Sequence, residues 1–338
     1  MRLDLHELFL ARQRLAQAGM VVHTPLVYAE GLSRRWQCQV WLKLDQLQPT
    51  GSFKLRGACH ALLSLPAEQQ RYGVAAASTG NFGRALGYAG QRLGIPVRVF
   101  ISERVPANKV AALQASGAEV IISGPSQDAA EALAQAHCAR SGMVYLSPFD
   151  DPAVILGQGT CGLEILQERP ETDTLIVGLS GGGLLGGVAL AAKSIQPDIQ
   201  VIGASLTEGA AMLDSLAAGQ PVAVPEVDSL ADSLGGGIGL HNRWTFALVR
   251  RWMDQGLRVS EASIARAMVY LLEEEKLLVE GACAATVGAV EQHALDLRGR
   301  CVVLVLSGRN VDLATLDRAR RLIQTAGGDD ADSSTSSA

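Results

Sequence analysis

A lysine that follows a turn near residue 50 is the first feature of this sequence that could do chemistry. Pro49 and Gly51 favour a turn, and Ser52 is a good N-cap for the apolar helix predicted to follow. Lys54 then lies in the first helical turn, where the partial positive charge of the helix end and burial against Phe53 both disfavour an ammonium. A neutral amine is what Schiff-base chemistry with an aldehyde cofactor requires. A lone lysine after a turn is more often an ordinary surface residue, so this prediction depends on the rest of the chain.

A glycine-rich loop is the second candidate. The sequence SGGGLLGG at 180–187 follows an apolar stretch and opens an alanine-rich segment. A strand, a glycine loop and a helix form a phosphate cradle, because glycines let backbone N–H groups approach an anion at the positive end of the helix. The glycines of this loop also satisfy GxGxxG, so a dinucleotide site with Glu208 as ribose partner is an alternative, as is simple helix–strand packing.

Two further polar loops follow apolar stretches. STGN at 78–81 supplies two hydroxyls and an amide that either caps the next helix or donates to a ligand oxygen. SGRN at 307–310 stands at the carboxyl end of the apolar segment 301–306, where open α/β sheets bind their ligands. Because these loops, the glycine loop and the lysine come from distant parts of the chain, we expect them to meet in one cleft between two domains.

Short apolar, β-branched segments alternate with helical stretches rich in alanine and leucine, a pattern that predicts an α/β fold with mainly parallel sheets. A strand at 40–44, ahead of the lysine turn, is expected to join the second of two sets of strands. The first set is 73–77, 97–101, 120–122 and 144–146, separated by helices at about 81–93, 107–116 and 127–141. The second set is 175–179, 201–205 and 301–306, with a long helix at about 261–276.

These two sets predict two domains, each with a mainly parallel sheet flanked by helices. We expect a large domain built from 1–66 and 149–326 and a small domain at 67–148, so that the chain crosses between them twice. The tail at 327–338 (GGDDADSSTSSA) has nothing to bury and is predicted to be disordered.

Composition excludes several classes of partner. The net charge of −5 leaves no basic field for nucleic acid or an anionic membrane. No apolar run reaches the roughly 18 to 20 residues of a membrane span, and the N-terminus lacks the layout of a signal peptide, so we expect a cytoplasmic protein. The six cysteines show no CxxC spacing and lie mostly in apolar stretches, so we expect buried free thiols rather than a metal site.

In order along residues 20–320, these motifs resemble the threonine/serine dehydratase family of fold type II pyridoxal-phosphate enzymes. The likeness is carried by GSFKLRGA at 51–58, STGN at 78–81, the triple-glycine loop and Ser307-Gly308. Within that family, ADSLGGGIGL at 231–240 and SGRNVD at 307–312 resemble the hydroxyectoine-utilisation dehydratase branch. The resemblance implies a tryptophan synthase β-like fold, with pyridoxal 5′-phosphate in the cleft between two domains, and a homodimer.

The resemblance also implies roles for individual residues. Lys54 would bind the cofactor covalently and act as base on the Cα proton, Phe53 would pack beside the cofactor ring, and Asn81 would hydrogen-bond its phenolic oxygen. Ser307 would face the pyridine nitrogen, which leaves the ring a weaker electron sink and favours elimination over transamination. The backbone N–H groups that hold the phosphate would come from Ser180, Gly181, Gly182, Gly183 and Leu184.

Two hydroxyl residues complete the implied set. Ser78 and Thr79, with neighbouring backbone amides, would receive the substrate carboxylate. Thr79 also occupies the position from which a serine hydroxyl acts on the opposite substrate face in racemases, so serine racemase activity is an alternative. β-Replacement, as in cysteine synthase-like relatives, is a further alternative, and a non-catalytic dinucleotide-binding module is the alternative of a different class.

The sequence departs from the family pattern in a few places. Phe82 stands where many members have histidine, and Ser180 replaces the first of four glycines; neither change should prevent cofactor binding. Ser205 and Ala211 align with two acidic ligands of the cation site found in other members, so we expect no metal here. The resemblance therefore predicts a lyase that removes the β-hydroxyl of threonine, serine or a hydroxyectoine-derived hydroxydiaminobutyrate, giving a 2-oxo acid and ammonia.

Overall fold

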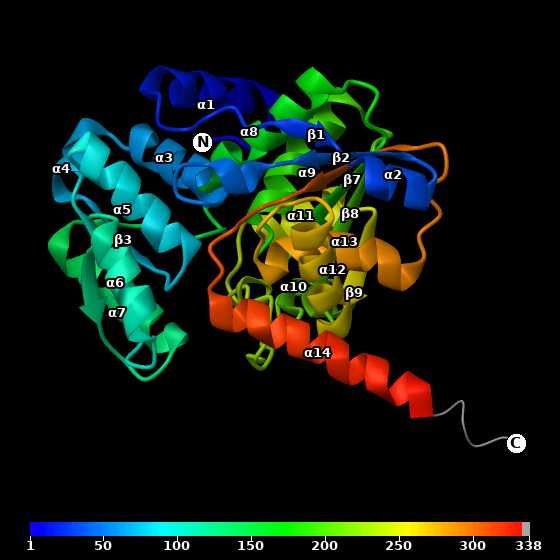
Figure 1. Cartoon of the computed structure of the whole chain (residues 1–338). Coiled ribbons are helices and arrows are strands. Elements are labelled where there is room, and N and C mark those ends of the chain that lie inside the picture. Colours follow the sequence, from blue (N-terminus) through cyan, green and yellow to red (C-terminus); the bar gives the residue numbers. More distant parts are fainter. Residues whose placement is uncertain (333–338) are drawn as a thin grey trace, which may run out of the picture.

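The computed structural model describes residues 1–332, with side chains as far as 325, and contains two β-sheets flanked by helices (Figure 1). The larger sheet has six strands in the order β1-β2-β10-β7-β8-β9, and every neighbouring pair is parallel except β1 with β2. The predicted strand at 40–44 is β2 of this sheet, as expected. The strands are β1 (Leu26–Tyr28), β2 (Gln39–Lys43), β7 (Thr174–Gly178), β8 (Gln200–Leu206), β9 (Gln255–Val259) and β10 (Cys301–Val305).

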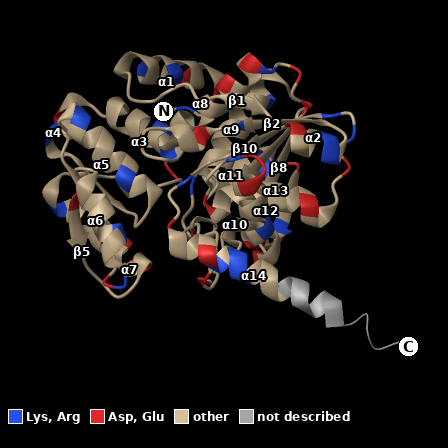
Figure 2. Cartoon of the chain, in the orientation of Figure 1, with Lys and Arg blue, Asp and Glu red and all other residues tan. Residues whose placement is uncertain are grey.

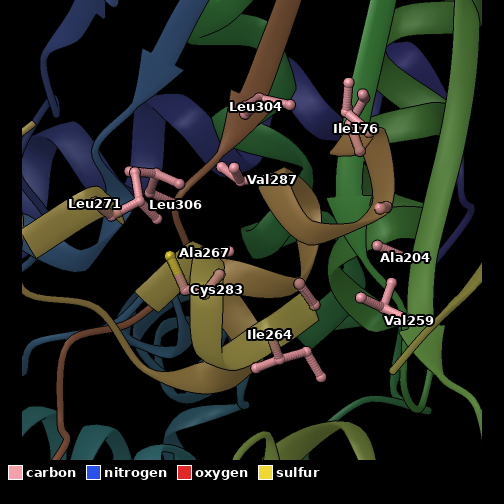
Figure 3. Close-up of a cluster of buried hydrophobic side chains, with 14 of the residues drawn as sticks. Ile176, Ala204, Val259, Ile264, Ala267, Leu271, Cys283, Val287, Leu304 and Leu306 are labelled. Carbon is pink, nitrogen blue, oxygen red and sulfur yellow. The ribbon is translucent and has the colours of Figure 1, made fainter. Parts of the chain in front are cut away.

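Strand β10 shows why this sheet is covered on both faces. Val302 and Leu304 lie in a core with helices α12 (Glu261–Glu273) and α13 (Gly281–His293), part of which is drawn in Figure 3. Val303 and Val305 lie in a second core with helices α8 (Pro152–Glu168) and α9 (Gly183–Ile195). Successive side chains of a strand point to opposite faces, so an uninterrupted apolar run is what a strand between two helical layers requires.

The smaller sheet has four parallel strands in the order β5-β4-β3-β6. The sequence predicted all four of these strands and the three helices between them, to within two residues at each end. They are β3 (Val74–Ala77), α5 (Asn81–Leu93), β4 (Val97–Ile101), α6 (Ala107–Ala115), β5 (Glu119–Ile122), α7 (Gln127–Ser141) and β6 (Val144–Tyr145).

Two strands of the larger sheet were not predicted, because neither has an apolar run long enough to stand out. Strand β9 reads Gln-Gly-Leu-Arg-Val, with its first two residues exposed, and β1 has only three residues at the opposite edge. The remaining elements are α1 (Leu5–Ala18), α2 (Glu30–Trp36), η1 (Asp45–Leu47), α3 (Lys54–Ser64), α4 (Ala67–Tyr72), α10 (Ala211–Ala218), η2 (Asp232–Leu234), α11 (Thr245–Trp252) and α14 (Leu313–Asp332).

We propose that the two sheets are the cores of the two predicted domains, 1–66 with 149–326 and 67–148. In Figure 1 the helices of the smaller sheet, α5 to α7, lie to one side of the larger sheet. The predicted disordered tail at 327–338 overlaps the end of α14, and residues 333–338 lie outside the described part of the chain.

The distribution of charged residues and the burial of the cysteines both agree with what the composition predicted. Basic and acidic residues are interspersed over the elements in Figure 2. All six cysteines are buried and free, which confirms the prediction that the thiols are buried. Among residues 1–332, the helices all fall short of the length and hydrophobicity of a membrane span.

Candidate active site

A cavity of about 330 Å³ lies where the loops after β3, β6, β7 and β10 meet the start of α3. These are the carboxyl ends of parallel strands from both sheets, so segments from distant parts of the chain converge as expected. All the residues that the sequence assigned to a cofactor or substrate line this cavity: Phe53, Lys54, Ser78, Thr79, Asn81, Ser180, Gly181, Gly182, Gly183, Leu184 and Ser307.

Lys54 is the first residue of α3, and its amine lies among apolar groups. The Nζ atom donates to the Pro148 carbonyl at 2.8 Å and lies 5.1 and 5.8 Å from the ring centroids of Phe53 and Phe82. Burial lowers the pKa of Lys54 to about 8, and the negative charge of Glu280 opposes this shift. With that pKa, about one amine in ten is neutral at pH 7, far more than for an ordinary lysine.

The turn before Lys54 is built differently from the prediction. Ser52 does not cap α3: its main chain forms an antiparallel bridge with Gly308, and Phe53 takes the N-cap position. The Phe53 N–H donates to the Ser307 carbonyl at 2.9 Å. The buried Ser52 hydroxyl has no hydrogen-bond partner in the described chain. This main-chain pairing, rather than a side-chain cap, places Lys54 beside Ser307 in the cavity wall.

The glycine loop connects β7 to α9, and its backbone faces the cavity. Gly182 has φ = +85°, in the left-handed region that favours glycine, and α9 begins at the next residue. A Cβ at Gly181 would collide with the Phe149 ring, and one at Gly183 would lie 3.0 Å from the Phe149 Cα. The loop therefore requires glycine, and it brings the N-terminus of a 13-residue helix to the cavity, where an anion is favoured.

The loop after β3 carries a cap and a donor. The Ser78 hydroxyl accepts a hydrogen bond from the Gly83 N–H at 3.2 Å and so helps to satisfy the first turn of α5. Thr79 lines the cavity beside it. Asn81 does not cap α5; its side-chain amide hydrogen-bonds to Glu280, which precedes α13, and to Asn310 in the loop after β10. Of the two roles left open for Asn81, the geometry therefore favours donation within the cavity.

Glu280 is a buried carboxylate of this site that the sequence analysis missed. It precedes α13, and its carboxylate accepts from the Asn81 Nδ2 at 2.9 and 3.0 Å and from the Asn310 backbone N–H at 2.8 Å. Burial raises the pKa of Glu280, and the hydrogen bonds from Asn81 and Asn310 oppose the shift. The sequence around it, Leu-Val-Glu-Gly-Ala, contains no motif that separates this carboxylate from those on the surface.

Four further residues shape the cavity. Phe149 packs against the glycine loop. Arg84, one turn after Asn81 on α5, lines the wall, and Lys109 on α6 forms an ion pair of 3.0 Å with Asp232 on η2. This pair joins elements of the smaller and larger sheets at the cavity. Asp232 belongs to a segment that the sequence analysis had singled out only for its resemblance to one branch of the family, whereas Asn310 lies in the polar loop at 307–310 that was expected in the cleft.

Known proteins provide an independent comparison. Residues 19–308 match the family described as pyridoxal-phosphate dependent enzymes. The chain is 43% identical over 311 residues to a threonine dehydratase homologue from Sinorhizobium fredii, with 92% of this chain and 93% of that protein covered. It is 38% identical over 299 residues to the L-threonine ammonia-lyase of Thermotoga maritima, with 88% and 74% covered.

A solved structure agrees with these sequence matches. The processed threonine deaminase isoform 2 of Solanum lycopersicum has a TM-score of 0.86 and 31% identity to this chain, with 94% of each chain covered. The fold type that the resemblance implied is thereby confirmed. The chain therefore belongs to the pyridoxal-phosphate-dependent enzyme family, within its threonine/serine dehydratase group.

Proposed function

We propose that this protein is a pyridoxal-phosphate-dependent ammonia-lyase that removes the β-hydroxyl of threonine or serine. The observation that carries the proposal is the position of Lys54: a lysine amine of lowered pKa shares one cavity with a glycine-lined helix N-terminus and with the polar loop at 78–81. Because the chain belongs to the pyridoxal-phosphate-dependent enzymes, the alternative of a non-catalytic dinucleotide-binding module is dropped.

The residues of the cavity fit the cofactor. The amine of Lys54 suits an aldehyde, the amides around Gly182 suit a phosphate, and the Ser307 hydroxyl and the Asn81 amide suit the polar atoms of the ring. Phe53 and Phe82 supply apolar surface beside the amine. When bound, pyridoxal phosphate supplies an aldehyde that links to amines and a conjugated ring that withdraws electrons from the substrate Cα.

Lys54 would perform the proton transfer. Its neutral amine would accept the substrate Cα proton, and the Pro148 carbonyl would accept a hydrogen bond from the resulting ammonium. Ser78, Thr79 and the first N–H groups of α5 would bind the substrate carboxylate at a helix N-terminus. The substrate loses water from Cα and Cβ, and hydrolysis of the resulting enamine returns one water, leaving a 2-oxo acid and ammonia.

The pH dependence of cofactor attachment tests the amine directly. Cofactor-free protein mixed with pyridoxal phosphate should develop its visible absorption band faster as the pH rises, with a midpoint near the lowered pKa of Lys54, about 8. The sign follows because only the neutral amine attacks the aldehyde. Stopped-flow absorbance from pH 6 to 11 measures the profile. A midpoint near the ordinary lysine value of 10.5, or no dependence on pH, would contradict this environment for Lys54.

We further propose a hydroxyectoine-derived hydroxydiaminobutyrate as a substrate. Two observations support it: the resemblance of 231–240 and 307–312 to that branch, and the charged side chains of Arg84, Lys109 and Asp232 in the cavity wall, which suit a polar group beyond the substrate Cβ. We also propose that the protein forms a homodimer, which sedimentation would test, and that it is cytoplasmic.

A product assay tests the activity. Purified holoenzyme given L-threonine, L-serine or the hydroxydiaminobutyrate should release 2-oxo acid and ammonia in equal amounts, with the highest kcat/KM for the diaminobutyrate. A higher kcat/KM for threonine would remove the finer substrate and leave the lyase. Formation of D-serine, or of a new amino acid when sulfide is added, without a 2-oxo acid, would replace the lyase with racemase or β-replacement activity.

A further inference from the structure

Three side chains from separate parts of the chain form a hydrogen-bonded series along one wall of the cavity. The Asn81 Nδ2 donates to both carboxylate oxygens of Glu280, at 2.9 and 3.0 Å. The Asn310 Nδ2 donates to the Asn81 Oδ1 at 2.6 Å and to the Thr50 carbonyl at 2.9 Å. The Asn310 backbone N–H donates to Glu280 as well. Each polar atom of the Asn81 amide thus has a partner of the opposite kind.

These contacts determine which way the Asn81 amide faces. An asparagine amide can rotate by half a turn and exchange its oxygen for its nitrogen, and only its partners decide between the two orientations. If Asn81 rotated, its oxygen would face the Glu280 carboxylate and its nitrogen would face the Asn310 Nδ2, pairing acceptor with acceptor and donor with donor. The Thr50 carbonyl fixes Asn310 in turn, because it accepts from the same Nδ2.

The absence of a side chain at Gly308 leaves space for the Glu280 carboxylate. The Glu280 N–H donates to the Gly308 carbonyl at 2.9 Å, and a Cβ at Gly308 would lie 2.5 Å from the Glu280 Oε1. Gly308 is also the residue that pairs with Ser52 ahead of Lys54. The charged groups that face Glu280 from neighbouring elements are Lys54 on α3, Arg84 on α5 and Asp232 on η2.

We propose that Glu280 and Asn310 are positioning residues that hold the Asn81 amide in the orientation that leaves one of its N–H groups to donate into the cavity. This inference rests on the proposed function, because the acceptor would be an oxygen of the bound cofactor. With one N–H shared between the two carboxylate oxygens of Glu280, the second N–H of the Asn81 amide is left to donate. Neither Glu280 nor Asn310 need touch the cofactor; they act through Asn81.

A double-mutant cycle on cofactor affinity separates this role from a general structural one. Asn81→Ala and Asn310→Leu should each raise the dissociation constant of pyridoxal phosphate, by about tenfold and about fivefold, as expected for the loss or misorientation of one hydrogen bond. In the Asn81→Ala background, Asn310→Leu should change that constant by less than about twofold, because its partner is already gone. Equilibrium dialysis, starting from the holoenzyme, measures the dissociation constant of pyridoxal phosphate for the wild type, the two single variants and the double variant.

The visible absorption maximum of the bound cofactor is the second readout. Asn310→Leu should shift it in the presence of Asn81 and leave it unchanged in the Asn81→Ala background. Glu280→Leu should shift it in the presence of Asn81, and the charge of Glu280 also reaches Lys54 directly. Glu131→Gln is the matched control, since Glu131 also accepts a side-chain hydrogen bond, from Tyr145 at 2.9 Å, but lies outside the cavity. This control should keep the wild-type affinity and spectrum.

Two results would overturn the proposal. One is an Asn310→Leu effect of equal size in both backgrounds, and the other is wild-type affinity and spectrum in both Asn310→Leu and Glu280→Leu. Failure of the proposed function would look different, because the unmodified protein itself would then bind no pyridoxal phosphate.

Discussion

Replacing Lys54 with alanine is expected to lower kcat for β-hydroxy amino acids by about 10³-fold or more. The substitution removes both the amine that anchors the cofactor and the base that accepts the Cα proton, and a positioned base alone contributes roughly 10²–10⁴ in rate. Lys54→Arg should fail to the same degree, since a guanidinium neither attacks an aldehyde nor gives up its proton at accessible pH. Release of 2-oxo acid by each purified protein measures the effect.

Lys193→Ala is a suitable control for these variants. Lys193 lies near the end of α9, paired with Asp254 at 2.8 Å and away from the cavity lining. The control should keep the wild-type kcat. Activity of Lys54→Ala within tenfold of the wild type would refute the assignment of Lys54 as the catalytic amine.

The largest expected effect on stability comes from Arg56, which lies two residues after the catalytic amine and is buried. Its guanidinium pairs with Asp45 at 2.7 Å and Glu164 at 2.6 Å, while the buried Lys43 pairs with Glu164 at 2.7 Å. Arg56→Met would leave the two carboxylates without their main partner in the protein interior. Removing one member of a buried ion pair costs about 3–5 kcal/mol, so we expect a loss of that size in the free energy of unfolding.

Guanidinium unfolding of cofactor-free protein measures this loss. Arg98→Met provides the contrast, because Arg98 pairs with Glu119 at the surface and should contribute less than about 1 kcal/mol. An Arg56→Met protein as stable as Arg98→Met would contradict the account. Because α3 carries both Arg56 and Lys54, we also expect the destabilised variant to lose cofactor more readily.

The same network gives a pH dependence of defined sign. Burial alone raises the pKa of Asp45 and of Glu164, but attraction and hydrogen bonds from Arg56 lower both pKa values overall. Each carboxylate therefore has a lower pKa in the folded protein than in the unfolded chain, where the values are 3.8 for Asp45 and 4.5 for Glu164. The ionised pair stabilises the folded state fully at a pH above these unfolded values, and this stabilisation is lost as the pH falls through the folded-state pKa values. The stability difference between the wild type and Arg56→Met should therefore narrow in acid.

Local signals predicted most of the elements that build the site. Helix α7 begins and ends where predicted, because the Ser126 side chain accepts from the Ala129 N–H and Gly142 ends the helix in the left-handed conformation. The glycine loop and the loop at 78–81 are likewise short-range features, in which a few adjacent residues determine the conformation.

Within the site, the error at Ser52 and the omission of Glu280 both involve partners distant in sequence. Ser52 was predicted to cap α3, but its main chain instead forms an isolated antiparallel bridge with Gly308, 256 residues later in the chain. Glu280 was missed because its hydrogen-bond donors are Asn81 and Asn310, which lie 199 and 30 residues away in the chain. A buried carboxylate is identifiable only when these donors are seen around it.

The measurement that tests the central claim most directly is the visible spectrum of the purified protein, followed by borohydride reduction and peptide mapping of the modified residue. We predict a yellow protein whose band is lost on reduction, with the cofactor then found on Lys54 and not on Lys109, the other lysine that lines the cavity. A protein that stays colourless when pyridoxal phosphate is added, or one that carries the reduced cofactor on a different lysine, would contradict the account.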